Sequence, residues 1–142
     1  MQLNSSTDYA LKIILYLAQH LHVVSSKKLS EAIQVSPRYL LQIGAKLREA
    51  ELVTVSHGAS GGYKLARSIE QITLFEVIFL MEGNIQSHQD TRNFSDTNGF
   101  FALEMVYKSI DHIMKQYLKN ITIKKLLTKP NQSLHSKWFR KK

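Results

Sequence analysis

The feature that most restricts the fold of this 142-residue chain is a strongly marked helix start at Ser36-Pro37. Serine is a preferred N-cap residue, and proline suits the first helical position because its missing N–H would have no partner there. Beyond this start, residues suited to packing recur at the helical spacing i, i+3, i+4 and i+7, namely Leu40, Ile43, Gly44 and Leu47. A helix with one such face must bury it against other elements.

A shorter helix is predicted directly before it, over residues 27–33. Ser25 or Ser26 can cap this helix, and Gln34-Val35 leaves only a tight connection to the next one. The residues expected to face inward are Leu29, Ala32 and Ile33. Two short helices joined by a tight turn, the second polar and basic near its N-terminus, form a helix-turn-helix pattern.

The segment after these helices predicts a β-hairpin. Residues 52–57 and 63–67 both have the composition of short strands, and the stretch between them, 58–62, contains three glycines. Glycines let a backbone approach another molecule closely, and their N–H groups can bind phosphate. A hairpin placed directly after a helix-turn-helix makes a winged helix.

Further helices are expected on either side of this unit. The N-terminal helix is predicted to begin within Ser5 to Asp8, because Ser5 and Asp8 have the spacing of a capping box. It continues toward Leu21 with apolar residues on nearly every side. A helix of this kind is buried on several sides. Thr73 opens a second capping box, and Gly83 can end the helix that follows it.

A long helix is predicted from Phe100 to about Lys119, after a segment, 84–98, that has no apolar period. Thr122 can cap a last short helix, which Pro130 ends. A long amphipathic helix after a complete small domain must bury its stripe, and pairing with a second copy across a two-fold axis is the simplest solution. The residues expected at this dimer interface are Leu103, Val106, Tyr107, Ile110, Ile113, Met114 and Tyr117.

The expected fold class is therefore mainly α with a small β-hairpin wing. A winged helix-turn-helix domain is expected over residues 1–83 and a loop over 84–98. The dimerisation helix and a short terminal helix would occupy 99–128, and a basic, disordered tail would occupy 129–142.

The formal charge of +8 is unevenly distributed. Residues 26–67 carry seven bases and three acids, and residues 108–142 carry ten bases and one acid. Between them, residues 68–107 carry one base and six acids. The excess suggests a polyanionic partner, and the first basic region coincides with the winged helix.

The chain contains no cysteine. Disulfides, thiolate zinc sites, cysteine nucleophiles and thiolate-ligated iron–sulfur clusters are therefore excluded. The start of the chain lacks the basic region of a secretion signal. The most apolar early stretch, Tyr9 to Ala18, is interrupted by Lys12 and is shorter than the roughly 20 residues that span a bilayer. We therefore expect a cytoplasmic protein that does not bind membranes.

Four groups of residues together form a recognisable pattern. They are Asp8-Tyr9-Ala10-Leu11, the spaced set Ser36, Tyr39, Leu40, Gln42 and Leu47, then Gly61-Gly62-Tyr63 with Leu65-Ala66, and Ile72-Thr73-Leu74 with Val77 and Glu82-Gly83. This pattern resembles the Rrf2 family of bacterial transcription regulators over roughly residues 1–128. The resemblance implies a winged-helix homodimer that binds palindromic operators in double-stranded DNA and represses or activates genes.

Many members of that family hold an iron–sulfur cluster through three cysteines in the loop before the dimerisation helix. The corresponding segment, 84–98, has none, so the chain resembles the cluster-free branch and no cofactor is expected. Some cluster-binding members use an acid near the position of Asp8, but a lone carboxylate cannot hold a cluster, so Asp8 is interpreted as a helix-start residue. Leu41 stands where cluster-sensing relatives often have a base-reading acid. Their operator sequence therefore does not carry over, and the effector is left open.

The residues expected to contact DNA lie on the second helix of the pair, at the start of the first, and on the wing. Arg38 suits a guanine edge and Gln42 an adenine edge, and each such pair contributes about 1–3 kcal/mol of discrimination. The alternative for this face is a merely solvated helix surface. The full expected set is Lys27, Lys28, Ser36, Pro37, Arg38, Tyr39, Gln42, Lys46, Ser60, Gly61, Gly62 and Tyr63.

Other chemistry finds little support. The glycine-rich tip also matches the G-x-S-x-G esterase motif, which needs a strand-to-helix turn in a large α/β sheet, whereas a strand pattern follows here. Ser60 is therefore interpreted as a wing-tip residue, and no enzyme is predicted. His20 and His22, or His88 with Asp90, could at most form weak ligand pairs, and no metal site is predicted.

An alternative from another class is a protein-interaction module whose winged helix no longer reads sequence. It would bind a partner through Tyr63, Trp138 and the basic residues 137–142, and its DNA binding would be lost at modest salt. The same tail could instead bind DNA phosphate or a membrane surface, or simply aid solubility. We favour a homodimeric, sequence-specific transcriptional repressor.

Overall fold

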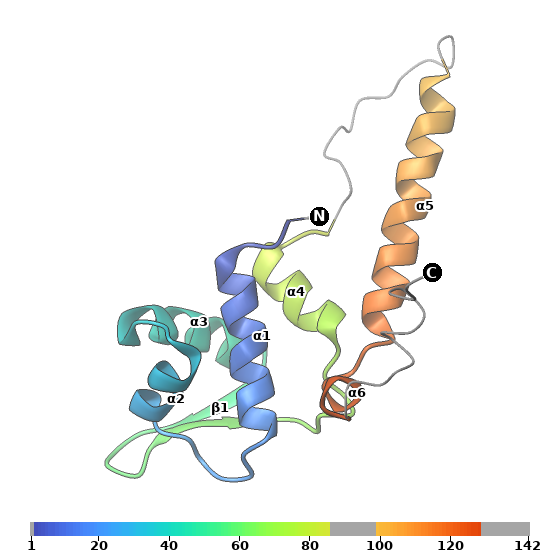
Figure 1. Cartoon of the computed structure of the whole chain (residues 1–142). Coiled ribbons are helices and arrows are strands. Elements are labelled where there is room, and N and C mark those ends of the chain that lie inside the picture. Colours follow the sequence, from blue (N-terminus) through green and yellow to red (C-terminus); the bar gives the residue numbers. More distant parts are fainter. Residues whose placement is uncertain (1, 86–98, 129–142) are drawn as a thin grey trace, which may run out of the picture.

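The computed structural model describes residues 2–85 and 99–128. Its elements are α1 (Ser5–Ala18), α2 (Ser26–Ile33), α3 (Pro37–Glu49), β1 (Val53–Ser56), β2 (Gly62–Leu65), α4 (Leu74–Glu82), α5 (Phe100–Lys119) and α6 (Ile123–Leu127). The two strands form an antiparallel hairpin, and α5 extends well beyond the other helices (Figure 1). The predicted fold class, a mainly helical winged helix with a long C-terminal helix, is confirmed.

Helix α1 lies at the centre of the fold. The helix pair, strand β2, α4 and α6 all contact it, and Ala10, Ile13 and Ile14 are completely buried between these elements. The predicted burial of this helix on several sides is confirmed. It ends at Ala18, however, so Leu21 lies outside it and is 90% exposed.

Helix α1 begins at Ser5, within the predicted range, and Asn4 rather than Ser5 is its N-cap residue. Asn4 makes no side-chain cap hydrogen bond and instead contacts Glu82 at the end of α4. The Glu82 carboxylate accepts hydrogen bonds from the Asn4 backbone N–H (2.7 Å), the Asn4 side-chain amide (2.8 Å) and the Thr7 hydroxyl (2.5 Å). A contact between residues 78 apart thus fixes where α1 begins.

Helix α2 is capped by Ser25, whose hydroxyl oxygen accepts the Lys28 N–H at 3.2 Å. The predicted inward position of Ala32 is wrong, because Ala32 is exposed and Ser30 is buried in its place. Burial of Ser30 is tolerated because its hydroxyl donates a hydrogen bond of 2.6 Å to the carbonyl of Val35, in the tight turn that follows.

Helix α3 begins as predicted. The Ser36 hydroxyl oxygen accepts the Tyr39 N–H at 3.1 Å, and Pro37 occupies the first turn. The predicted inward residues Leu40, Ile43, Gly44 and Leu47 are all buried.

The hairpin pairs Val53 with Leu65 and Ser56 with Gly62, so both strands are shorter than the predicted ranges. A further bridge joins β2 to the segment between α1 and α2. Val24 donates to the Tyr63 carbonyl at 2.9 Å, and Tyr63 donates to the Val24 carbonyl at 2.8 Å. The wing is therefore attached by backbone hydrogen bonds to the chain just before α2.

The C-terminal helices return to this same core. Thr73 and Thr122 cap α4 and α6, as predicted, and Gly83 follows α4 with a φ of 79°. The Ile123 N–H donates to the Ile72 carbonyl at 2.9 Å, and the Ile123 side chain is fully buried in the α1–α3 core. Most of the predicted loop, 86–98, and the predicted tail, 129–142, lie outside the described residues, and the predicted domain boundaries stay a prediction.

Candidate nucleic-acid interface

The outer face of α3 is open to solvent along its length. Arg38, Gln42 and Lys46 are exposed on it, together with Leu41 and Glu49. Because the opposite face is buried, the rotation of the helix about its own axis is fixed. The guanidinium supplies paired donors and the amide supplies one donor and one acceptor. These groups match those that read base edges in the major groove.

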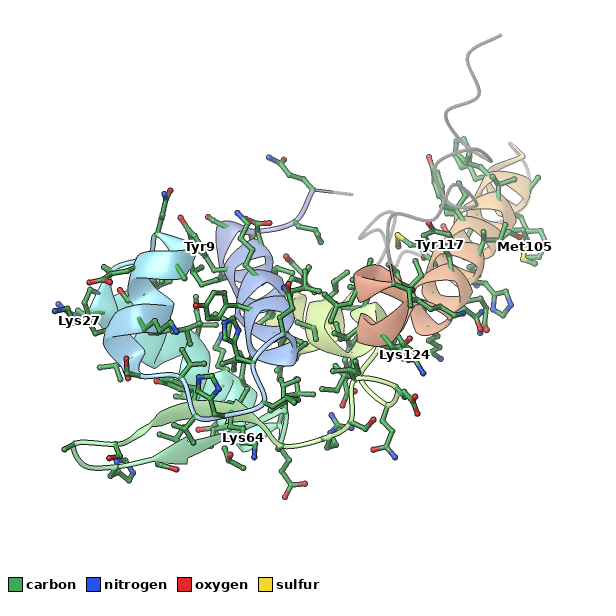
Figure 2. All side chains as sticks on the ribbon, turned by 60° about the horizontal axis from the view of Figure 1, so that its bottom comes forward. Tyr9, Lys27, Lys64, Met105, Tyr117 and Lys124 are labelled. Atoms are coloured by element: carbon green, nitrogen blue, oxygen red, sulfur yellow. The ribbon has the colours of Figure 1, made fainter. Side chains whose placement is uncertain are left out.

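The N-terminal ends of α2 and α3 add polar groups beside this face. Ser36 and Pro37 are exposed at the start of α3, although the Ser36 hydroxyl oxygen already serves as the helix cap. Lys27 and Lys28 are exposed in the first turn of α2, and Figure 2 shows Lys27 pointing away from the body of the protein. Free ammonium groups in such places suit phosphate oxygens.

Tyr39 is half-buried, because its ring packs against Tyr9 of α1. The two ring centroids lie 5.6 Å apart with the planes at 86°, an edge-to-face arrangement. Only part of the Tyr39 side chain is therefore available to a partner, and the contact joins α3 to α1.

The tip of the wing is exposed from Ser56 to Ser60, and Gly61 is half-buried. The Gly61 N–H donates to the Gly58 carbonyl at 3.0 Å, which closes the turn, and Gly58 has a φ of 97°. Ser60 is thus free to contact a partner, whereas the N–H of Gly61 is already used within the turn.

Tyr63 does not belong to this exposed surface, so its predicted contact with DNA is not carried into the interface proposed below. Its side chain is only 3% exposed, and its ring packs so closely on α3 that a Cβ at Gly44 would lie 2.7 Å from it. Burial raises the pKa of the Tyr63 phenol, while the charge of Arg48 and a hydrogen bond with Ser26 act in the opposite direction. Tyr63 therefore anchors the wing to both helices of the pair.

Gly62 is also buried, so its predicted role as a contact residue is likewise not carried into the proposed interface. Its φ is 151°, and a Cβ there would lie 2.0 Å from the Val24 carbonyl oxygen. Sequence alone offered one signal for Tyr63. Tyr63 and Leu65 alternate with Lys64, and in a strand this pattern turns both apolar residues to the same, inward face.

The apolar stripe of α5 is exposed in the part of the chain that the structure describes. Leu103, Val106, Ile110, Ile113 and Tyr117 are between 44% and 66% exposed. Tyr107 and Met114, predicted in the same set, are half-buried, and Met114 packs instead against the small cluster that contains Leu118. Five large apolar residues along one face form a continuous exposed apolar patch, which is typical of an interaction surface.

The histidines of the α1–α2 connection approach each other but do not form a metal site. The rings of His20 and His22 lie 5.9 Å apart, and His20 Nδ1 lies 2.7 Å from the Tyr16 carbonyl oxygen. Within residues 2–85 and 99–128, no group of three or more His, Asp or Glu side chains is placed to hold a metal ion. His88 and Asp90 lie outside the described residues. No helix in the described part of the chain is long and apolar enough to cross a membrane.

Comparison with known proteins identifies the family to which a chain with this geometry belongs. The sequence model of the Rrf2 family, described as an iron-dependent transcriptional regulator, matches residues 3–129. The transcriptional regulator NsrR of Halalkalibacterium halodurans is 29% identical over 93% of this chain and 94% of its own length. NsrR of Shouchella clausii is 36% identical over 61% of this chain and 59% of its own length. The solved structure of CymR, the global cysteine regulator of B. subtilis, superposes with a TM-score of 0.79 at 26% identity and covers 92% of this chain and 99% of that one.

The iron in the family description can be tested against the donor atoms of this chain. Clusters in proteins are held by thiolates, and the sequence has no cysteine, so it cannot hold a cluster in that way. The described residues also offer no alternative set of nitrogen and oxygen ligands. The exposed polar face of α3, the wing beside it and the family match over residues 3–129 agree with one another. This chain belongs to the Rrf2 family of DNA-binding transcriptional regulators and resembles its cysteine-free members.

Proposed function

We propose that this regulator is a homodimeric repressor that binds a palindromic operator. The observation that carries the proposal is that one chain has two separate exposed surfaces, one polar and one apolar. The polar face of α3 is exposed beside the wing, and the apolar stripe of α5 is not covered by any other described segment, within residues 2–85 and 99–128.

In the proposed complex, α3 enters the major groove. Arg38 contacts a guanine and Gln42 an adenine, while Lys46 contacts the base edges or the backbone beside them. Lys27 and Lys28 neutralise phosphates, as does the N-terminal end of α3. The wing tip at Ser60 and Gly61 follows the neighbouring backbone or minor groove.

The dimer follows from α5. Pairing its stripe with that of a second copy removes five half-exposed apolar side chains from water on each chain. A two-fold axis would place two copies of α3 about 34–36 Å apart, one turn of DNA, which is why we propose a palindromic site. A signal that changes the angle between the two α5 helices would change this spacing and thereby the affinity for DNA.

Electrophoretic mobility shift on the genomic region around the gene for this protein tests the reading face. Arg38→Ala with Gln42→Ala removes both base contacts of a half-site, which together contribute about 2–6 kcal/mol. Specific affinity should therefore fall by about 30-fold to 10⁴-fold per half-site. Lys108→Ala with Gln116→Ala is the matched control, because both residues are exposed on α5 and it should leave binding unchanged.

Three results would contradict the proposal. Specific binding that survives the Arg38 and Gln42 changes would show that another face reads DNA. Binding that is weak, indifferent to sequence and lost at modest salt would favour the protein-interaction module. Sedimentation of the protein as a monomer at micromolar concentration would contradict the proposed dimer.

A further inference from the structure

Helix α1 also approaches the proposed reading surface. Its residue Tyr9 packs against Tyr39 in the first turn of α3, and Figure 2 shows Tyr9 at the boundary between α1 and the α2–α3 pair. One turn further along α1, the Lys12 ammonium lies 5.7 Å from the centroid of the Tyr9 ring. It is also 2.7 Å from the Asp8 carboxylate. The ammonium is therefore held against Tyr9, the residue through which α1 contacts the first turn of α3.

A second observation places Lys12 beside the turn of the helix pair. Lys12 and Gln34 line one shallow groove between α1 and the end of α2. Gln34 is the left-handed residue, φ 60°, that ends α2 immediately before the α3 start. The Lys12 side chain is 52% exposed, so its charge is available to a partner at this place.

The position matters because DNA presents phosphates on both sides of a helix in its major groove, which is about 12 Å wide. On α3, Tyr39 and Lys46 lie on one flank and Arg48 on the other, from their spacing along the helix. The start of α2 is on the Arg48 side, because the Tyr63 ring packs on Gly44, one turn before Arg48, and the Tyr63 backbone pairs with Val24 just before α2. Lys27 and Lys28 therefore serve that flank. Lys12 lies on the Tyr39 flank, where α2 offers no lysine.

We propose that α1 carries a DNA-backbone contact of its own, in which the Lys12 ammonium pairs with a phosphate of the strand next to Tyr39. The inference rests on the proposed DNA-binding function and extends the interface to a helix outside the helix-turn-helix. Asp8 holds the ammonium in the free protein and shares it with phosphate in the complex, so this acid opposes binding through its own charge.

Binding measured by fluorescence anisotropy over a range of salt concentrations tests this contact. The probes are the genomic fragment and a random duplex of the same length, because phosphate contacts register on both. For Lys12→Gln, the slope of log Kobs against log salt should become shallower by about 0.9 per bound protomer, which corresponds to about fivefold weaker binding per contact at 0.15 M salt. Lys108→Gln makes the same charge change on α5 and should leave the slope unaltered.

The Asp8→Asn variant separates a backbone contact from a structural role. If Lys12 only stabilised α1 through Asp8, both variants would behave alike, whereas a phosphate contact predicts tighter binding for Asp8→Asn, by about twofold or more. A Lys12→Gln slope equal to that of Lys108→Gln on both duplexes overturns the inference. If the protein does not distinguish the genomic from the random duplex, the proposed specific function fails, and the slope on the random duplex still decides the role of Lys12.

Discussion

The attachment of the wing makes a sharp prediction at Gly62. Replacing this residue with alanine puts a Cβ 2.0 Å from the Val24 carbonyl oxygen and 2.5 Å from its carbonyl carbon, so the two backbones must move apart. The movement breaks the two Val24–Tyr63 hydrogen bonds, of 2.9 and 2.8 Å. At about 0.5–1.5 kcal/mol each, their loss costs about 1–3 kcal/mol. The φ of 151° adds about 1–3 kcal/mol of backbone strain for a residue with a side chain.

Gly58 provides the matched control, because it lies in the same wing and also has a positive φ, 97°, but a Cβ there would meet nothing within 4 Å. Gly58→Ala should therefore cost only the strain, about 1–3 kcal/mol, and Gly62→Ala about 2–6 kcal/mol. Urea unfolding followed by circular dichroism, at one fixed protein concentration, measures both free energies. If Gly62→Ala is no more destabilising than Gly58→Ala, the Val24 bridge does not hold the wing and the reasoning is refuted.

Three further outcomes are expected. Ile110→Asp places a charge in the exposed stripe and should convert a dimer to a monomer by size-exclusion chromatography, whereas Leu21→Asp, at another exposed apolar side chain, should not. Glu82→Ala leaves the start of α1 without its carboxylate partner and should reduce the free energy of unfolding by about 1–3 kcal/mol, and an unchanged value would contradict the role of that contact. The hydrogen bond and charge of Lys124 lower the pKa of Glu70, so the pair contributes stability above the ordinary pKa of that carboxyl and loses it as pH falls through the lowered one. Glu70→Gln should therefore be slightly less stable than the wild type at pH 7 and equally stable once pH is below the lowered pKa, and a difference that persists in acid would argue against the pair.

Local signals in the sequence were sufficient for several elements. Ser36-Pro37 determines the start of α3 because a capping hydroxyl and a proline act within one turn of the helix. The bounds of α5 also matched, Phe100 to Lys119, since its apolar period is long and uninterrupted.

The differences arise where distant contacts decide the outcome. Asn4 rather than Ser5 is the N-cap residue of α1, because Glu82, at the far end of α4, bonds to it. Tyr63 is buried because β2 pairs with Val24 as well as with β1, and no local sequence pattern predicts that bridge. The candidate contact residues of α3 could be named from its inward face alone, whereas the approach of Lys12 required the packing of α1 on α3.

The backbone bridge between Thr73 and Thr122 has a mechanical consequence. It fastens the C-terminal end of α5 to the body that carries α3, while α5 itself extends about 30 Å from that attachment, at 1.5 Å per residue. Because α5 is attached at one end, a rotation of about 5° about that end displaces the other end of the helix by about 2.6 Å. Conversely, in the proposed dimer, a shift of that size between the two α5 helices would turn each DNA-binding domain through the same angle. No rearrangement inside the domain would be needed.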